Sequence, residues 1–266
     1  NLTQYKDGEI MIKGEAYSKI DKYIVDTGYG LERFVWASKG SPTIYDAIFP
    51  SIVNELMGLA GIDHELDNTE YAHILSQNAC LAGLMDISEK ANLLELRKQV
   101  ASSIGTTVEK LSSIMEPVET VYAITDHTRC LTFMFGDGII PSNVKAGYLA
   151  RLVLRRTLRM MRDLDIRIPL SEIVKMHINN LPEYPEFEVR FETIEDILHH
   201  EEQKFAETLD SGRRMIQKSA KHYKKSGEKI PLDTLIDMYD SHSIPPEISK
   251  ETAAQVGGEV GRPETF

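Results

Sequence analysis

The first forty residues alternate short apolar runs with polar residues and glycines. Residues 9–13 and 23–25 are two such runs, rich in β-forming side chains, and they predict two short strands. A glycine-containing turn follows at residues 26–34 and leads into a helix. The pattern therefore predicts a small segment with β-structure at this end of the chain.

From residue 41 onward, apolar residues recur at helical spacing almost to the end of the chain. Ser41 and Pro42 predict a helix start, with serine as the N-cap and proline at the first helical position. Further helical patterns occupy residues 88–113, 120–135, 143–163, 169–182, 187–225, 231–239 and 247–254. The predicted fold class is therefore mainly α, a helical bundle preceded by a short β-containing segment.

The longest predicted helix, at residues 187–225, carries a seam like that of a coiled coil. Two sets of residues recur every seven positions, namely Leu198, Phe205 and Gly212, and Leu209, Ile216 and Tyr223. Such a seam packs along a partner helix, and we expect the partner inside the fold. We divide the chain into a β-containing start at residues 1–40, a helical unit at 41–183 and a second helical unit at 184–266.

The composition is that of a folded protein without broad DNA affinity. Of 266 residues, 42% are hydrophobic and 27% are charged, which excludes a chain that is disordered by composition. The 41 acidic residues outnumber 30 lysines and arginines, giving a net charge of −11. A domain that coats DNA would be broadly basic, so we expect no DNA partner, but one local basic patch could still bind RNA.

The cysteine count and the hydropathy pattern favour a cytoplasmic location. Two cysteines, Cys80 and Cys130, exclude a disulfide scaffold and suggest a reducing compartment. The sequence contains neither an apolar run of about 18 residues nor a signal peptide, so we expect no membrane partner. The chain opens at Asn1 without a methionine and closes on a loose stretch at residues 255–266, so we expect part of a longer protein.

A basic stripe is the clearest charge feature of this acidic chain. Residues 143–167 contain seven basic side chains and two acidic ones. Four arginines share one helix face at about 100° per residue: Arg151, Arg155, Arg159 and Arg162. Leucines such as Leu149 and Leu154 cover most of the rest, so we expect one buried side and one basic side. The pattern leaves open whether the arginines bind phosphates or pair with carboxylates of the chain itself.

A second basic cluster closes the long helix. It consists of Lys218, Lys221, Lys224, Lys225 and Lys229. Lysines at the carboxyl-terminal end of a helix suit the helix dipole and are usually solvated. RNA contact is the less favoured interpretation of this cluster.

Two loops carry side chains that suit ligand chemistry. In the turn at residues 26–34, the glycines allow close approach of a ligand, Asp26 could bind an ammonium group and Arg33 a phosphate. Near the start of the helix predicted at residues 120–135, Asp126 and Arg129 flank a histidine, and a structural role is the better interpretation. Neither a zinc site nor a nucleophile triad is predicted, so we assign no metal ligand and no catalytic residue.

Two polar residues could read the edge of a base. Asn143 stands at a predicted helix start and Asp240 follows Tyr239 in a short polar stretch. An amide offers a donor and an acceptor together, and a carboxylate accepts from amino groups. Taken singly, Asn143 is interpreted as a helix cap and Asp240 as a turn residue.

Three segments together resemble the alanyl-tRNA synthetases of archaeal type. Val25-Asp-Thr-Gly-Tyr-Gly-Leu-Glu-Arg33 resembles motif 3 of class II synthetases in its alanyl form. Asp126-His-Thr-Arg129, followed by Asp137-Gly-Ile-Ile-Pro-Ser-Asn143 and Gly147-Tyr148, is similar to the start of that family's tRNA-recognition domain. Tyr239-Asp240-Ser-His242 is similar to a later motif of the same domain, so the resemblance covers nearly the whole chain.

The resemblance implies an activity and assigns roles to residues. The family attaches alanine to tRNA(Ala) through an alanyl-adenylate made from ATP with Mg²⁺. Residues 1–40 would end the catalytic domain, and residues 41–183 and 184–266 would form two tRNA-recognition subdomains. The implied roles are alanine binding by Asp26 and Gly28, ATP binding by Arg33, recognition of the G·U pair of the acceptor stem by Asn143 and Asp240, and contact with stem phosphates by Arg151, Arg155, Arg159 and Arg162.

The resemblance also implies that some functional parts of the family lie outside this chain. Motifs 1 and 2, which carry most ATP contacts, and the editing domain with its Zn²⁺ ligands would lie outside it. We therefore expect tRNA binding but no alanyl-tRNA synthesis by the isolated chain, which we expect to be monomeric. Two alternatives stay open, a small ATP-dependent ligase built on Asp26 and Arg33, and a non-catalytic helical interaction scaffold built on the seam of the long helix.

Overall fold

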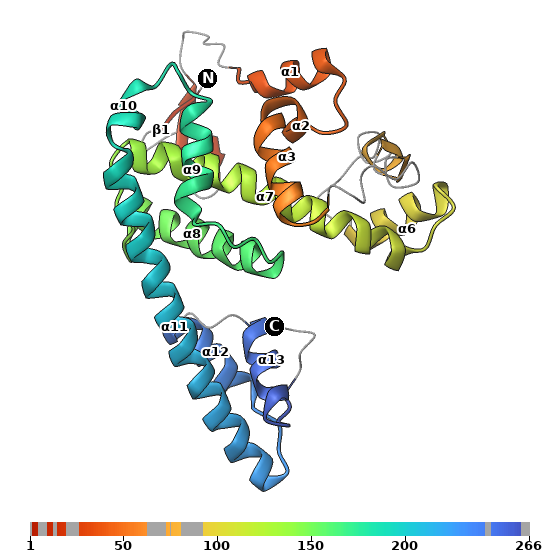
Figure 1. Cartoon of the computed structure of the whole chain (residues 1–266), viewed down its shortest axis with the longest axis vertical. Helices are drawn as coiled ribbons and strands as arrows, with labels where there is room; N and C mark the ends of the chain where they lie inside the picture. The colour runs from red at the N-terminus through yellow and green to blue at the C-terminus, as the bar shows by residue number, and fades with distance from the viewer. Residues whose placement is uncertain are drawn as a thin grey trace. The chain divides into compact units, whose positions relative to one another are not determined.

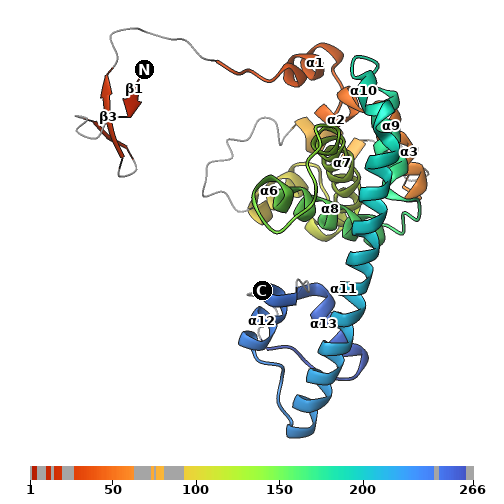
Figure 2. The ribbon, with the colours of Figure 1, turned by 90° about the vertical axis from the view of Figure 1, so that its left-hand side faces the viewer.

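A computed structural model describes residues 2–4, 10–12, 15–19, 27–62, 73–74, 76–80, 93–242 and 246–261 (Figure 1; Figure 2 shows the ribbon turned by 90°). The chain forms two compact units, Asn1–Ile48 and Phe49–Phe266. The finer division at residues 40 and 183 stays a prediction. Helices dominate the described residues, which confirms the mainly α fold class, and none of these helices is long and apolar enough to cross a membrane.

The first unit begins with a small antiparallel sheet. Its strands are β1 (Leu2–Gln4), β2 (Ile10–Ile12) and β3 (Glu15–Lys19), in the order β1-β3-β2. Thr3 lies opposite Ser18, and Met11 lies opposite Ala16. The strand predicted at residues 9–13 is confirmed as β2, whereas the strand predicted at residues 23–25 lies outside the described residues.

Two short helices complete the first unit, and one of them begins later than predicted. Helix α1 (Leu31–Lys39) lies between two glycines, and α2 (Ile44–Ile48) follows. The N-cap predicted at Ser41 is wrong. Thr43 takes that role instead, because its Oγ1 accepts from the Asp46 N–H at 3.3 Å while the Asp46 carboxylate accepts from the Thr43 N–H at 3.1 Å. This reciprocal pairing satisfies two amide groups that the helix itself leaves free.

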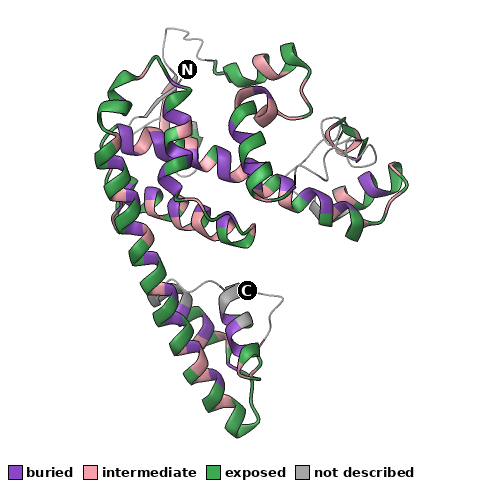
Figure 3. Ribbon diagram, viewed as in Figure 1, coloured by how far each residue is buried: buried purple, intermediate pink, exposed green. Residues whose placement is uncertain are grey.

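The second unit is a helical bundle in which one long helix, α7 (Val108–Gly136), packs against several others. Its helices are α3 (Pro50–Leu59), α6 (Leu93–Ser103), α7 (Val108–Gly136), α8 (Lys145–Asp163), α9 (Leu170–Asn179), α10 (Pro185–Val189), α11 (Phe191–Ser226), α12 (Leu232–His242) and α13 (Pro246–Gln255). Helix α7 packs against α3, α6, α8 and α9. Buried residues recur along its whole length, with intermediate and exposed residues between them (Figure 3).

Helix α7 differs from the two helices predicted in this region. The pattern at residues 88–113 breaks after Ser103, and α7 begins after Thr107, whose Oγ1 caps the Lys110 N–H at 3.2 Å. The helix then continues through Pro117. A proline inside a helix costs about 3 kcal/mol, and burial of its neighbours Ile114 and Val118, exposed by 2% and 0%, offsets that cost.

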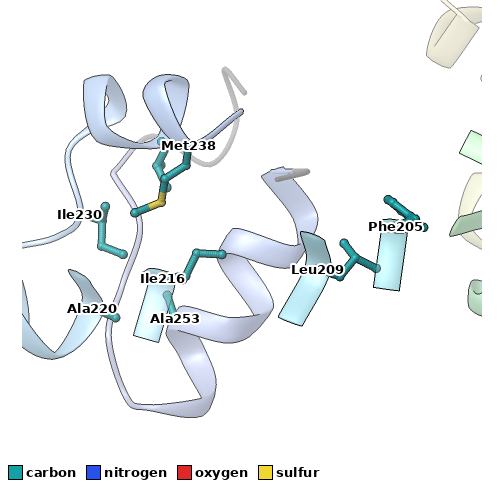
Figure 4. Packing of buried hydrophobic residues seen from close by; sticks show 8 residues of the cluster. Phe205, Leu209, Ile216, Ala220, Ile230, Met238 and Ala253 are labelled. Atoms are coloured by element: carbon teal, nitrogen blue, oxygen red, sulfur yellow. The ribbon is translucent and has the colours of Figure 1, made fainter. Parts of the chain in front are cut away.

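Helix α11 confirms the seam predicted from its heptad spacing. Leu198, Phe205, Leu209, Gly212 and Ile216 are all buried. Along the second half of the helix, Ile216 and Ala220 pack against Met238 and Ala253, which belong to α12 and α13 (Figure 4). The seam is therefore used inside the fold, as expected.

Candidate nucleic-acid interface

Helix α8 is covered by two neighbours, and this decides where its arginines lie. The helix packs against α7 and also against α11. Ala150, Leu154 and Met161 are buried. Two of the four predicted arginines, Arg151 and Arg155, flank this buried side and contact residues of α11, so the basic side that we expected is partly covered. The exposed residues of this helix include Tyr148, Leu149 and Leu152, which are 54%, 50% and 47% exposed, as well as the basic Arg156 and Arg162.

Arg151 is fully engaged within the protein. Its Nε donates to Glu201 Oε2 at 3.0 Å, and its Nη2 donates to Glu201 Oε1 at 2.8 Å. Its Nη1 donates to Asn143 Oδ1 at 2.5 Å, and Nη2 also reaches the Pro141 carbonyl oxygen at 3.2 Å. Arg151 thus joins α11, α8 and the loop before α8. For Arg151, the structure therefore favours pairing with a carboxylate of the chain itself over phosphate binding.

Glu201 is a buried carboxylate that sequence reasoning missed. It lies on α11 and is only 3% exposed. Burial raises its pKa, but the hydrogen bonds and charge of Arg151, aided by Lys204 and Arg155, outweigh that effect and leave the pKa below its ordinary value. The carboxylate is therefore charged near neutral pH, and it needs its arginine partner because an unpaired buried charge is costly.

Arg155 is also turned inward. Its guanidinium carbon lies 5.7 Å from the centre of the Phe205 ring on α11, a distance suited to a cation–π contact. Burial, and then the neighbouring charge of Arg151, lower the pKa of Arg155, while Glu201 opposes this. Its Nε is buried without a hydrogen-bond partner among the described residues. Arg155 therefore packs between the two helices.

The other two arginines of the predicted face, Arg159 and Arg162, differ in their exposure. Arg159 is half-buried and makes contacts within the protein. Arg162 is exposed, and its Nη2 lies 3.2 Å from Asp163 Oδ1 in a pair that is open to solvent on both sides. Such an exposed ion pair contributes at most about 1 kcal/mol. Arg162, and the exposed Arg156 on the next face, can therefore turn to an incoming phosphate at little cost.

The loop before α8 holds Asn143 at the surface. The Ser142 N–H donates to the Gly147 carbonyl at 3.0 Å, and the Ser142 hydroxyl donates to the Val144 carbonyl at 3.0 Å. Lys145 has a φ of 52°, in the left-handed region that non-glycine residues seldom adopt. The N-cap residue of α8 is Val144, so the interpretation of Asn143 as a helix cap is wrong. Its side chain is exposed and bonded to Arg151.

The structure describes the backbone of Asp240. It lies in α12, two residues before the end of that helix, so its interpretation as a turn residue is wrong. Its side chain lies outside the described residues. The structure therefore does not test whether Asn143 and Asp240 face a common ligand, and their joint role stays a prediction.

The turn predicted to bind alanine and ATP belongs to the first unit. Asp26 lies outside the described residues. Gly28 is exposed, and no atom of the described residues lies within 4 Å of the place where a Cβ would stand. Arg33 is exposed on the first turn of α1, close to Gly30. The alanine-binding and ATP-binding roles of this turn stay predictions.

The neighbours of Asp126 pack within the second unit, whereas Asp126 itself is exposed and its structural role stays a prediction. Asp126 lies inside α7 rather than near a helix start. The guanidinium of Arg129 stands 4.8 Å from the centre of the Phe133 ring, and the neighbouring Thr128 Oγ1 lies 2.9 Å from His177 Nε2. Among the described residues, no group of three or more His, Cys, Asp or Glu side chains is arranged to hold a metal ion.

The second basic cluster is largely solvated. Lys224 donates to the Val256 carbonyl at 3.1 Å, and Lys229 pairs with Glu259 at 2.6 Å. Lys218, Lys221 and Lys225 are exposed. The cluster therefore partly fastens the segment after α13 to the end of α11.

Comparison with known proteins decides the family. The model of the family described as tRNA synthetases class II (A) matches residues 4–266. The chain belongs to this family. Three relatives named alanine–tRNA ligase align with 100% of the chain: those of Methanococcoides burtonii, Methanothrix thermoacetophila and Methanoculleus marisnigri are 79%, 61% and 49% identical to it. The chain spans 29% of the length of each of these relatives. Membership of the class II family agrees with the motif 3 resemblance of residues 25–33.

Proposed function

We propose that a protein containing this chain attaches alanine to tRNA(Ala), and that this chain recognises the acceptor stem and its G·U pair. The reaction would proceed through an alanyl-adenylate made from ATP with Mg²⁺, in the cytoplasm. Membership of the class II family and the names of the archaeal relatives support the aminoacylation reaction. The isolated chain, as a monomer, would bind RNA without making alanyl-tRNA.

One observation carries the recognition role: Asn143 is an exposed amide held in place by a buried ion pair. Its Oδ1 accepts from Arg151, and Arg151 is itself bonded to both carboxylate oxygens of Glu201. A group that reads a base must be held in register, and the contact with Arg151 would supply that support. A-form RNA exposes base edges and 2′-hydroxyls in a wide, shallow minor groove, which an exposed amide can reach.

The remaining site residues take roles that suit their exposure. Asp240 would accept from the unpaired amino group of guanine in the G·U pair. Arg162, Arg159 and the exposed Arg156 would contact stem phosphates, whereas Arg151 and Arg155 would act mainly from within the fold. In the first unit, Asp26 and Gly28 would bind alanine, and Arg33 would contact an ATP phosphate.

The alternative of a helical interaction scaffold is less well supported. It was based on the apolar seam of α11, and that seam is buried against other helices of the chain. The second alternative, a small self-sufficient ligase, would need more phosphate-binding groups near Arg33 than the described residues of the first unit supply.

Binding to short RNA stems tests the proposal. The chain would be titrated at low salt with an alanine-tRNA acceptor stem and with the same stem carrying G·C in place of G·U. We expect a preference for G·U, and we expect Asn143→Ala and Asp240→Ala each to reduce it by roughly 1–3 kcal/mol, the usual value of a specific base contact. Equal affinity for the two stems would contradict the recognition role.

A further inference from the structure

A series of contacts leads from the interior of the bundle to the surface at Asn143. Glu201 is 3% exposed and accepts two hydrogen bonds from Arg151, at 3.0 and 2.8 Å. Arg151 then donates from Nη1 to Asn143 Oδ1 at 2.5 Å. The three side chains come from α11, α8 and the loop before α8, so the amide contacts α8 directly and α11 through Arg151.

The chemistry of Arg151 determines which way the amide faces. A guanidinium has five N–H donors and no acceptor, so only the oxygen of the amide can face it. The Nδ2 amino group of Asn143 must then point away from Arg151. Because Asn143 is exposed, that amino group is offered to solvent as a pair of hydrogen-bond donors.

Arg151 cannot easily leave this position to bind a phosphate. Its side chain is only 18% exposed, and that of Glu201 is 5% exposed. If the guanidinium moved to an RNA phosphate, it would leave a buried carboxylate without its bidentate partner, which is strongly unfavourable. Arg162 is under no such constraint, since its partner Asp163 is exposed. The two arginines therefore differ in what they can do, although they share a helix face.

The geometry points to Arg151 as a positioning residue and Glu201 as its anchor, which together present the amide N–H groups of Asn143 to acceptors in the minor groove of the RNA. This inference rests on the proposed function. On this inference Asn143 donates to a ring nitrogen, a carbonyl oxygen or a 2′-hydroxyl. That role complements the one that the proposed function already gives to Asp240, which is to accept from the guanine amino group.

The test is a double-mutant cycle on the preference for G·U over G·C. The chain would be compared with Asn143→Ala, Arg151→Ala and the double variant, using the two acceptor stems. We expect each single variant to lose about tenfold in preference, within the range of one base contact, and the double variant to lose no more. Arg151→Lys should lose the preference too, because one ammonium group cannot hold the carboxylate at two points and the amide at a third. Arg162→Ala is the matched control, and it should weaken both stems equally.

Two results would overturn the inference directly. If Arg151→Ala weakened both stems equally and kept the preference, Arg151 would be a phosphate contact. If it lowered the preference further in the Asn143→Ala background, it would act independently of Asn143.

A measurement without RNA tests the geometry on its own and allows for variants that fold poorly. Glu201→Gln keeps the shape of the anchor and removes its charge. NMR relaxation of the Asn143 side-chain amide should show a rigid group in the unchanged chain and a mobile one in Glu201→Gln and Arg151→Lys. Equal mobility in all three would overturn the positioning role. Lack of any G·U preference in the unchanged chain would refute the proposed function. It would also mean that the contacts from Glu201 through Arg151 to Asn143 do not serve RNA recognition.

Discussion

The carbonyl of Gly147 accepts a hydrogen bond from the Ser142 N–H at 3.0 Å, and a Cβ at position 147 would collide with the Ser142 hydroxyl and the Ile140 carbonyl oxygen. Helix α8 and the loop that carries Asn143 therefore touch at a point where only glycine fits. We predict that Gly147→Ala displaces this loop, lowers the free energy of unfolding by about 1–3 kcal/mol and reduces the preference for a G·U stem.

Gly258→Ala is the control for that substitution. A Cβ at Gly258 would stand 2.8 Å from the Ala220 Cβ, far along the chain from the Asn143 loop. It should lower stability in the same way and leave the G·U preference intact. If the two variants changed the preference equally, general loosening of the fold rather than loop displacement would be the cause. Stem titration and denaturant unfolding on both variants give the answer.

Arg155 and Arg162 should separate stability from RNA affinity. Arg155→Ala removes a half-buried guanidinium over the Phe205 ring and should lower the free energy of unfolding by about 1 kcal/mol. Arg162→Ala should leave stability within about 0.5 kcal/mol of the unchanged chain. It should also weaken RNA binding uniformly and reduce the slope of log affinity against log salt by about 1. Unfolding curves and salt titrations measure the two effects. A loss of stability in Arg162→Ala, together with a reduced salt slope only in Arg155→Ala, would contradict the account.

His177 should make the fold sensitive to acid. Burial, and then the charge of Arg129, lower its pKa from 6.5 to about 3. Between these values the unfolded chain binds a proton that the folded chain does not, so stability is present above pH 6.5 and is lost as the pH falls toward 3. The loss is at most about 5 kcal/mol.

Replacement of the imidazole isolates that contribution. His177→Gln cannot take up a proton, so its free energy of unfolding should fall less steeply between pH 6.5 and pH 3 than that of the unchanged chain. Denaturant titrations at several pH values measure the two slopes. Parallel curves would mean that other groups dominate the acid response.

We predict that the seam residues of α11 stabilise the core of the second unit and are not a binding surface for another protein. Ile216 is 0% exposed, whereas Ile236 on α12 is 43% exposed. Ile216→Ala should cost about 2–5 kcal/mol of stability, and Ile236→Ala should cost far less for the same chemical change. Similar costs at both positions, measured by denaturant unfolding, would mean that Ile216 is not held in a packed interior.

Much of this fold follows from periodicity, and the exceptions have physical causes. The seven-residue spacing of Leu198 and Phe205 correctly predicted the buried face of α11. The continuation of α7 through Pro117 could not be predicted from local helix preference, because burial of the neighbouring side chains offsets the cost of a proline inside a helix. The true N-cap at Thr43 was detectable, since Asp46 stands three residues later and completes a capping pair.

The site was predicted less completely than the fold. The angles along α8 correctly grouped Arg151 with Arg155, but a helical wheel for one helix does not say how many neighbours cover it. Helix α11 covers the arginine flank, and Glu201 is the residue that meets it. One signal for Glu201 was present, because it lies between Leu198 and Phe205 at the spacing of the buried seam. A lone carboxylate at a core position indicates a buried cationic partner.

The most direct test of the account removes a single functional group from the RNA. Inosine in place of the guanosine of the G·U pair lacks only the 2-amino group. We predict that the inosine stem binds the unchanged chain more weakly by roughly 1–3 kcal/mol, and that Asp240→Ala binds the two stems equally while Asn143→Ala still distinguishes them. Equal affinity of the unchanged chain for the guanosine and inosine stems would contradict minor-groove recognition of this pair.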